Sequence, residues 1–175
     1  MPKEYKTIKK IVDKFAYTND LGKDKITFTI TAGTYANLFA TEIGLCENEI
    51  CDYYSNLNPF NKYKRIKGID INQLINQTYL LNGIEAAAWS HGLIWISRST
   101  FQTFGNNNNY LACVIAHEIS HIINNDSFNN KVKLSENKNN WKSIKKIKNY
   151  KRKEELLKKR ISRETETKAD FLATR

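Results

Sequence analysis

The chain reads LACVIAHEISHII at residues 111–123, and the HExxH sequence inside this stretch begins at His117 and ends at His121. Four residues make about one turn of an α-helix, so the two imidazoles lie on one face and can bind a single metal ion. Glu118 lies beside them. Two histidines and one acid are the groups that zinc-dependent hydrolysis requires. The stretch therefore predicts a zinc site on a helix, with Glu118 as the general base that takes a proton from the metal-activated water.

The surroundings of the motif argue against a chance match in an ordinary core helix. Glu118 is the only charged residue between Leu111 and Ile123. A solvent-exposed helix would carry charges around its histidines, and a carboxylate buried beside two imidazoles costs free energy unless a cation neutralises it. We therefore favour the metal site over the chance match.

Catalytic zinc takes three protein ligands, so a third ligand must come from elsewhere in the chain. His91, the only other histidine, is one candidate. Glu166 and Asp170 are better ones, because their spacing of four residues places both carboxylates on one face of a helix. We expect Glu166 to bind the metal and Asp170 to accept a hydrogen bond from a metal-binding histidine. The alternative is a charged helix end paired with nearby lysines.

HExxH followed by ExxxD resembles the gluzincins, in which two histidines and a downstream glutamate hold zinc. A closer resemblance is to metallopeptidase family forty-eight, the group of the HtpX, Oma and CAAX prenyl proteases. Three segments resemble the signatures of this family and follow its order: residues 85–98, 111–118 and 162–170. The resemblance implies a zinc metalloendopeptidase that acts on peptide or unfolded protein substrates.

The same resemblance implies an α+β fold, a mainly helical zincin-like domain with a small sheet whose edge strand borders the active-site cleft. We expect that edge strand at residues 93–97, where main-chain hydrogen bonds would hold an extended peptide. The substrate-binding residues would be Leu93, Ile94, Trp95 and Ile96. The alternative is an interior strand with Trp95 in the core.

The sequence departs from the family pattern at positions that remove no metal ligand: Glu85, Ser90, His91 and Ser120. Arg175 comes five residues after Asp170, whereas the family generally continues with more helix. Residues that polarise the scissile carbonyl often lie in that later part. This ending favours one alternative function, a catalytically inactive zinc-binding domain.

Length and composition fit one domain over residues 1–175, with 41% hydrophobic residues and a single core. The chain has no apolar run of about 18 residues and no signal segment, so we expect a cytoplasmic protein. Cys46, Cys51 and Cys113 are odd in number and lack metal-site spacing. We expect buried free thiols in a reducing compartment.

The positive charge is concentrated between Lys131 and Arg163. This segment holds 14 Lys and Arg against three Glu, a net charge of +11, whereas the whole chain carries +10. We interpret the basic insertion at about residues 131–160 as a solvated loop. The first alternative is a basic amphipathic helix in which Trp141, Ile144 and Ile147 contact an anionic membrane. The second, a nucleic-acid-binding module, leaves the HExxH helix without a purpose.

Hydrophobic spacing predicts five helices and two strands. The helices are expected at residues 3–17, 34–49, 71–81, 110–123 and 154–175, and the strands at 26–30 and 93–97. Asn124 and Asn125 should end the helix that carries the HExxH motif, because asparagine tolerates left-handed backbone.

Overall fold

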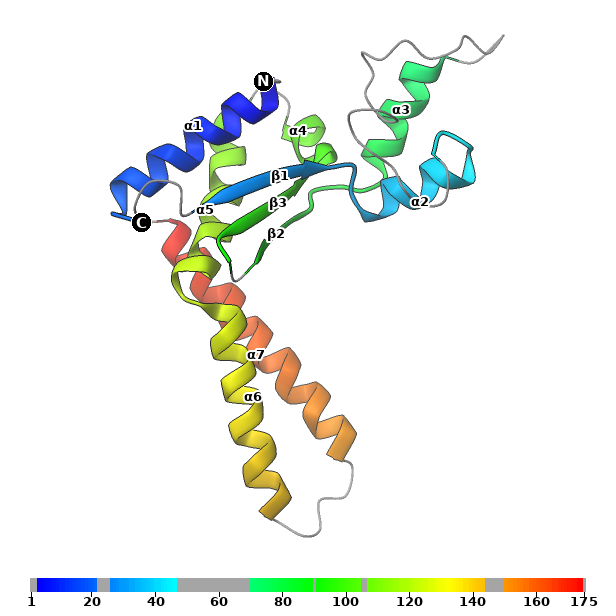
Figure 1. The fold of residues 1–175 in the computed structure, drawn as a ribbon. Coiled ribbons are helices and arrows are strands. Elements are labelled where there is room, and N and C mark those ends of the chain that lie inside the picture. Colours follow the sequence, from blue (N-terminus) through cyan, green and yellow to red (C-terminus); the bar gives the residue numbers. More distant parts are fainter. Residues whose placement is uncertain are drawn as a thin grey trace.

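The computed structural model describes residues 3–21, 26–46, 70–89, 91–104, 107–143 and 150–174. These residues are mostly helical, with one small sheet, which confirms the expected α+β class (Figure 1). Every helix in these ranges is too short or too polar to cross a membrane.

The sheet has three strands in the order β1-β3-β2. The central strand β3 (Leu93–Ser97) pairs in parallel with β1 (Thr27–Thr31) and antiparallel with β2 (Ala86–Trp89). The prediction that residues 93–97 form the edge was therefore wrong. Backbone groups on both sides of β3 are already paired, so the strand cannot bind a peptide along its edge.

One face of the sheet packs against α1 (Lys3–Thr18) and α5 (Asn108–Ile123), with α4 (Arg98–Phe104) leading from β3 into α5 (Figure 1). Ile94 and Ile96 are two positions apart in β3, so both point to this face, and both are fully buried. They lie at the centre of the hydrophobic core, so their side chains cannot contact a substrate. Its buried members are Ile8, Val12, Ile26, Ile30, Ile94, Ile96, Leu111, Ile115 and Ile119.

A second, smaller cluster lies between α2 (Thr34–Glu42) and α3 (Ile71–Leu80). Asn82 and Glu85 hold the start of α2. The Glu85 carboxylate accepts hydrogen bonds from the backbone N–H and the hydroxyl of Thr34, and the Asn82 side chain accepts one from the N–H of Tyr35 at 2.8 Å. These contacts satisfy N–H groups that the first helical turn leaves unpaired.

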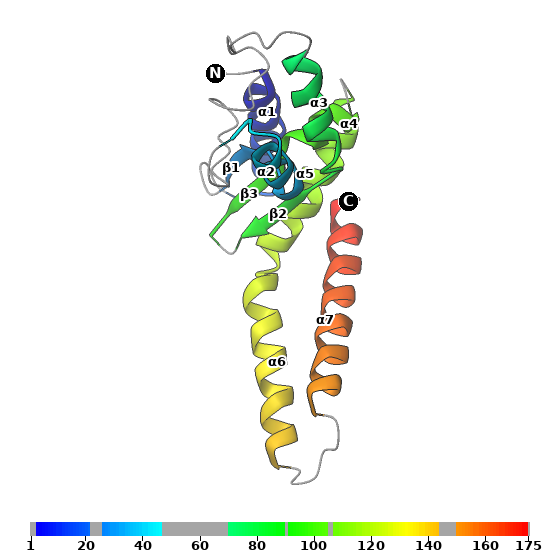
Figure 2. The same ribbon diagram turned by 90° about the vertical axis from the view of Figure 1, so that its right-hand side faces the viewer.

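The basic segment forms a helical hairpin of α6 (Asp126–Ser143) and α7 (Tyr150–Ala173), which extends away from the sheet (Figures 1 and 2). Polar pairs join the two helices. The Thr165 hydroxyl donates to the Asn130 side chain at 3.0 Å, and the Lys138 ammonium lies 2.8 Å from the Glu154 carboxylate. Ile161 is buried between these pairs.

The solvated-loop interpretation was therefore wrong for residues 131–143 and 150–160, which are helical. Of the residues proposed as membrane anchors, Trp141 lies in the last turn of α6, but its side chain is not described, and Ile144 and Ile147 lie outside the described residues. Membrane contact through them stays a prediction.

The cysteines also differ from the expectation. Cys46 is bonded in a disulfide, and Cys113 is free but exposed rather than buried. Disulfides persist mainly in oxidising compartments, so the argument for a reducing compartment from free thiols no longer holds. Cys51 lies outside the described residues.

Candidate metal centre

Helix α5 presents both histidines of the HExxH motif beside the core. Its apolar side chains, Leu111, Ile115 and Ile119, are buried against the sheet, which fixes the rotation of the helix. His117 and His121 follow Ile115 and Ile119 by two positions, about 200° around the helix axis, and their side chains are 23% and 15% exposed. The imidazoles are thus held at the rim of the core, where an ion and a substrate can reach them.

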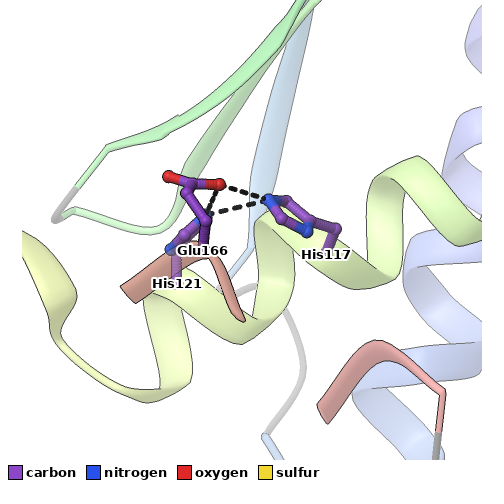
Figure 3. A group of neighbouring side chains, drawn as sticks. All are labelled: His117, His121 and Glu166. Carbon is purple, nitrogen blue, oxygen red and sulfur yellow. Dashed lines mark hydrogen bonds and ion pairs between the residues drawn. The ribbon is translucent and has the colours of Figure 1, made fainter. Parts of the chain in front are cut away.

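Helix α7 brings Glu166 to these histidines across the hairpin. The Nε2 atoms of His117 and His121 lie 3.0 Å apart. The Oε2 atom of Glu166 lies 3.1 Å from His117 Nε2 and 3.6 Å from His121 Nε2 (Figure 3). These three atoms point toward one another from two helices that are far apart in sequence.

The separations fit a tetrahedral zinc site. Two ligand atoms that each lie about 2.0–2.1 Å from a zinc ion at a tetrahedral angle are about 3.3 Å apart. The observed 3.0, 3.1 and 3.6 Å lie on both sides of that value. Two imidazole nitrogens and one carboxylate oxygen are also a ligand set that catalytic zinc uses.

Each histidine has a carboxylate on its other ring nitrogen. Asp170 Oδ1 lies 2.8 Å from His117 Nδ1, as the sequence indicated for a metal-binding histidine. Asp126 Oδ2 lies 2.9 Å from His121 Nδ1. A carboxylate at Nδ1 favours the tautomer that keeps the proton there, which leaves the lone pair of Nε2 free for a metal.

Sequence reasoning missed Asp126. Helix α5 ends at Ile123, and Asn125 takes a left-handed backbone with φ of 51°, as the two asparagines predicted. This turn starts α6 at Asp126, whose side chain is only 10% exposed. The sequence predicted no helix directly after Asn125, so nothing indicated that Asp126 would contact His121.

Glu118 is 7% exposed and lies next to both imidazoles. Burial raises the pKa of its carboxyl above the ordinary value, and Glu166 adds to this effect. His117, His121 and the backbone N–H of Ala88 act in the opposite direction. The contact with Ala88 places the carboxylate against β2, the edge strand of the sheet.

Two other residues from the sequence analysis lie elsewhere. His91 is exposed in the turn between β2 and β3 and does not belong to the group of candidate ligands found in the described residues. Glu85, which replaces the asparagine usual in the resembled family, is occupied at the start of α2.

Comparison with known proteins agrees with this geometry. The profile of peptidase family M48 matches residues 72–175, more than half of the chain and all of the residues of the centre. The chain belongs to peptidase family M48. Its members are metallopeptidases, and the matched range includes His117, His121 and Glu166, a group that could hold a metal ion. Searches of curated proteins and of solved structures found no match.

We expect Asp126→Ala and Asp170→Ala each to weaken metal affinity about ten- to a hundredfold, because each removes the partner that orients one histidine. Asp126→Asn should be milder, since the amide oxygen still accepts a hydrogen bond. Competition with a zinc chelator measures the affinity. Glu136→Ala, which removes an exposed acid from α6, is the matched control. Unchanged affinity in Asp126→Ala would contradict the orienting role.

Proposed function

We propose that this M48 protein is a zinc-dependent endopeptidase. The observation that carries the proposal is the convergence of His117 Nε2, His121 Nε2 and Glu166 Oε2 beside a buried Glu118. Zinc accepts this mixed nitrogen and oxygen set. It would supply a Lewis acid that makes water acidic near neutral pH and polarises the substrate carbonyl.

The side chains of the chain have separate roles in this reaction. Glu118 accepts the proton of the attacking water and donates it to the leaving amine. Its burial supports that role, because a raised pKa brings the carboxyl closer to the working pH. Asp170 and Asp126 keep the two histidines in orientation. The position of Glu118 beside the ligands favours an active enzyme over an inactive zinc-binding domain.

The first test is the metal. We expect about one zinc per chain by elemental analysis, loss of peptidase activity on chelation, and recovery when zinc is returned. His117→Ala and Glu166→Ala should lose the metal, since each leaves two protein ligands. His91→Ala is the control, because it removes the one histidine outside the centre. A His117→Ala protein that kept its full zinc content would refute the ligand assignment.

The second test separates metal binding from chemistry. Glu118→Gln should keep the zinc and the fold but lose at least about a hundredfold in kcat on an unfolded protein such as casein. The amide has the same shape as the carboxylate but cannot accept the proton. Circular dichroism and zinc content report folding and binding. Equal turnover by the variant and the parent would exclude Glu118 as the general base.

We propose that the substrate binds to β2, along the edge that faces away from β3. Ser97 donates to the Glu85 carbonyl at 2.8 Å and Gly92 donates to the Trp89 carbonyl at 3.0 Å. Hydrogen-bonded pairs alternate along an antiparallel ladder, so the backbone groups of Ala86 and Ala88 point away from β3. Ala88 also contacts Glu118. A peptide that pairs with this edge would therefore pass the general base.

Replacement of single substrate amides tests this binding mode. If a peptide adds to the β2 edge, N-methylation should raise KM at every second residue near the cleaved bond, because only alternate N–H groups face the strand. A scan of N-methylated versions of one cleaved peptide gives the pattern. Equal effects at neighbouring residues, or none, would show that the substrate does not bind as a strand.

A further inference from the structure

The face of α7 that carries Glu166 continues along the hairpin as a line of positive charge. Arg152, Lys159 and Arg163 precede Glu166 and Asp170 at spacings that keep all five residues within about 60° around the helix axis. We call the three cations the cationic ridge. The metal ligand and the ridge thus belong to one continuous surface of one helix.

The ridge is open to solvent. All three of its side chains are exposed, and none makes an ion pair within the described part of the chain. Neighbouring cations differ in this respect, because Lys158 is paired with Glu154 and Arg160 with Glu164. The ridge therefore carries charge that its own helix does not neutralise.

The spacing of the ridge suits an extended polypeptide. A helix rises about 1.5 Å per residue, so Lys159 lies about 10 Å and Arg152 about 21 Å along the axis from Glu166. An extended chain rises about 3.3 Å per residue. These positions correspond to about three and six residues from a bond cleaved at the metal.

We propose that the cationic ridge binds acidic residues of the polypeptide substrate, about three to six residues from the scissile bond. This inference rests on the proposed endopeptidase function and names its substrate class. A polypeptide is favoured over other polyanions because only a substrate must contact both the metal and the surface that leads to it. Exposed cations next to the centre would also raise the rate of encounter with acidic chains.

A membrane surface fits the described residues less well. Helices that lie on membranes present a wide apolar face beside their charges. On α7 the apolar residues Leu157 and Ile161 are partly or fully buried, and Leu156 is the exposed large aliphatic residue within the length of the ridge. A soluble acidic partner needs no such face.

The experiment compares matched peptides that share one cleaved core. One has neutral flanks, and the others carry Asp or Glu at the third and sixth residues on the N-terminal or the C-terminal side. At low salt we expect kcat/KM to be about two- to thirtyfold higher for the acidic peptide on at least one side, as two exposed ion pairs would give. The preference should disappear at about 1 M salt.

Arg152→Ala combined with Lys159→Ala should remove this preference through KM and leave cleavage of the neutral peptide unchanged. Arg163 is kept, because it lies one turn from the metal ligand. Lys10→Ala combined with Lys14→Ala removes the same charge from the exposed surface of α1 and should leave the preference intact. Arg152→Glu with Lys159→Glu should instead favour peptides with basic flanks.

Three results would overturn the proposal. The first is no preference for acidic peptides, and the second is a preference that the ridge variant keeps. The third is a ridge variant whose only loss is its binding to phosphatidylserine vesicles or RNA. If no peptide is cleaved, the proposed function fails separately. In that case, the fluorescence anisotropy of a fluorescein-labelled acidic peptide measures its binding to the Glu118→Gln protein. This binding tests the role of the ridge without cleavage. Binding that depends on Arg152 and Lys159 supports it, and its absence refutes it.

Discussion

The buried carboxylate of Glu118 sets the main constraint on this structure. It lies beside two imidazoles in a helix whose other buried residues are almost all apolar, where an unneutralised negative charge is unfavourable. Around it the chain places two histidine nitrogens and the Glu166 carboxylate within about 4 Å of one another, a separation typical of ligands on one zinc ion. A divalent cation bound between the surrounding helices would neutralise the negative charges of Glu118 and Glu166.

The hairpin of α6 and α7 brings Glu166 close to the two histidines, although these residues are far apart in the sequence. Glu166 follows His121 by 45 residues, yet the two helices return the chain to α5. The turn at Asn125 gives two results at once. It directs α6 away from the sheet, and it places Asp126 on the free nitrogen of His121. The hairpin is therefore part of the candidate metal centre, because its first residue contacts His121 and its second helix carries Glu166.

Much of the centre could be predicted from the sequence, because helical spacing is regular. The positions of His117, His121, Glu166 and Asp170 follow from intervals of four residues, and the structure brings all four together. The end of α5 also followed from its two asparagines. Roles that depend on local spacing along one helix are the ones that a single sequence states most clearly.

Features that depend on distant partners could not be predicted in the same way. Alanines 86–88 have low strand propensity, so nothing marked β2, and no local signal showed that β3 pairs with β1, which lies more than 60 residues upstream. The edge was therefore assigned to β3 from the family resemblance. Within the hairpin, α6 showed no clear hydrophobic period, although hydrophobic spacing predicted most of α7 as a helix at residues 154–175. Its contacts are largely polar, such as Asn130 with Thr165 and Lys138 with Glu154. Such a helix pair looks like a charged loop when only apolar residues are counted.

The register of the small sheet connects the fold to the chemistry. Gly92 adopts a φ of 79°, which glycine accommodates readily, and its N–H closes the turn onto the Trp89 carbonyl. This turn sets Trp89 opposite Leu93, and the alternation of the ladder then directs Ala88 toward Glu118. A slip of one residue would place the backbone N–H of Ala87 beside the carboxylate in place of that of Ala88. The geometry of one glycine turn thus determines which backbone group stands beside the proposed general base.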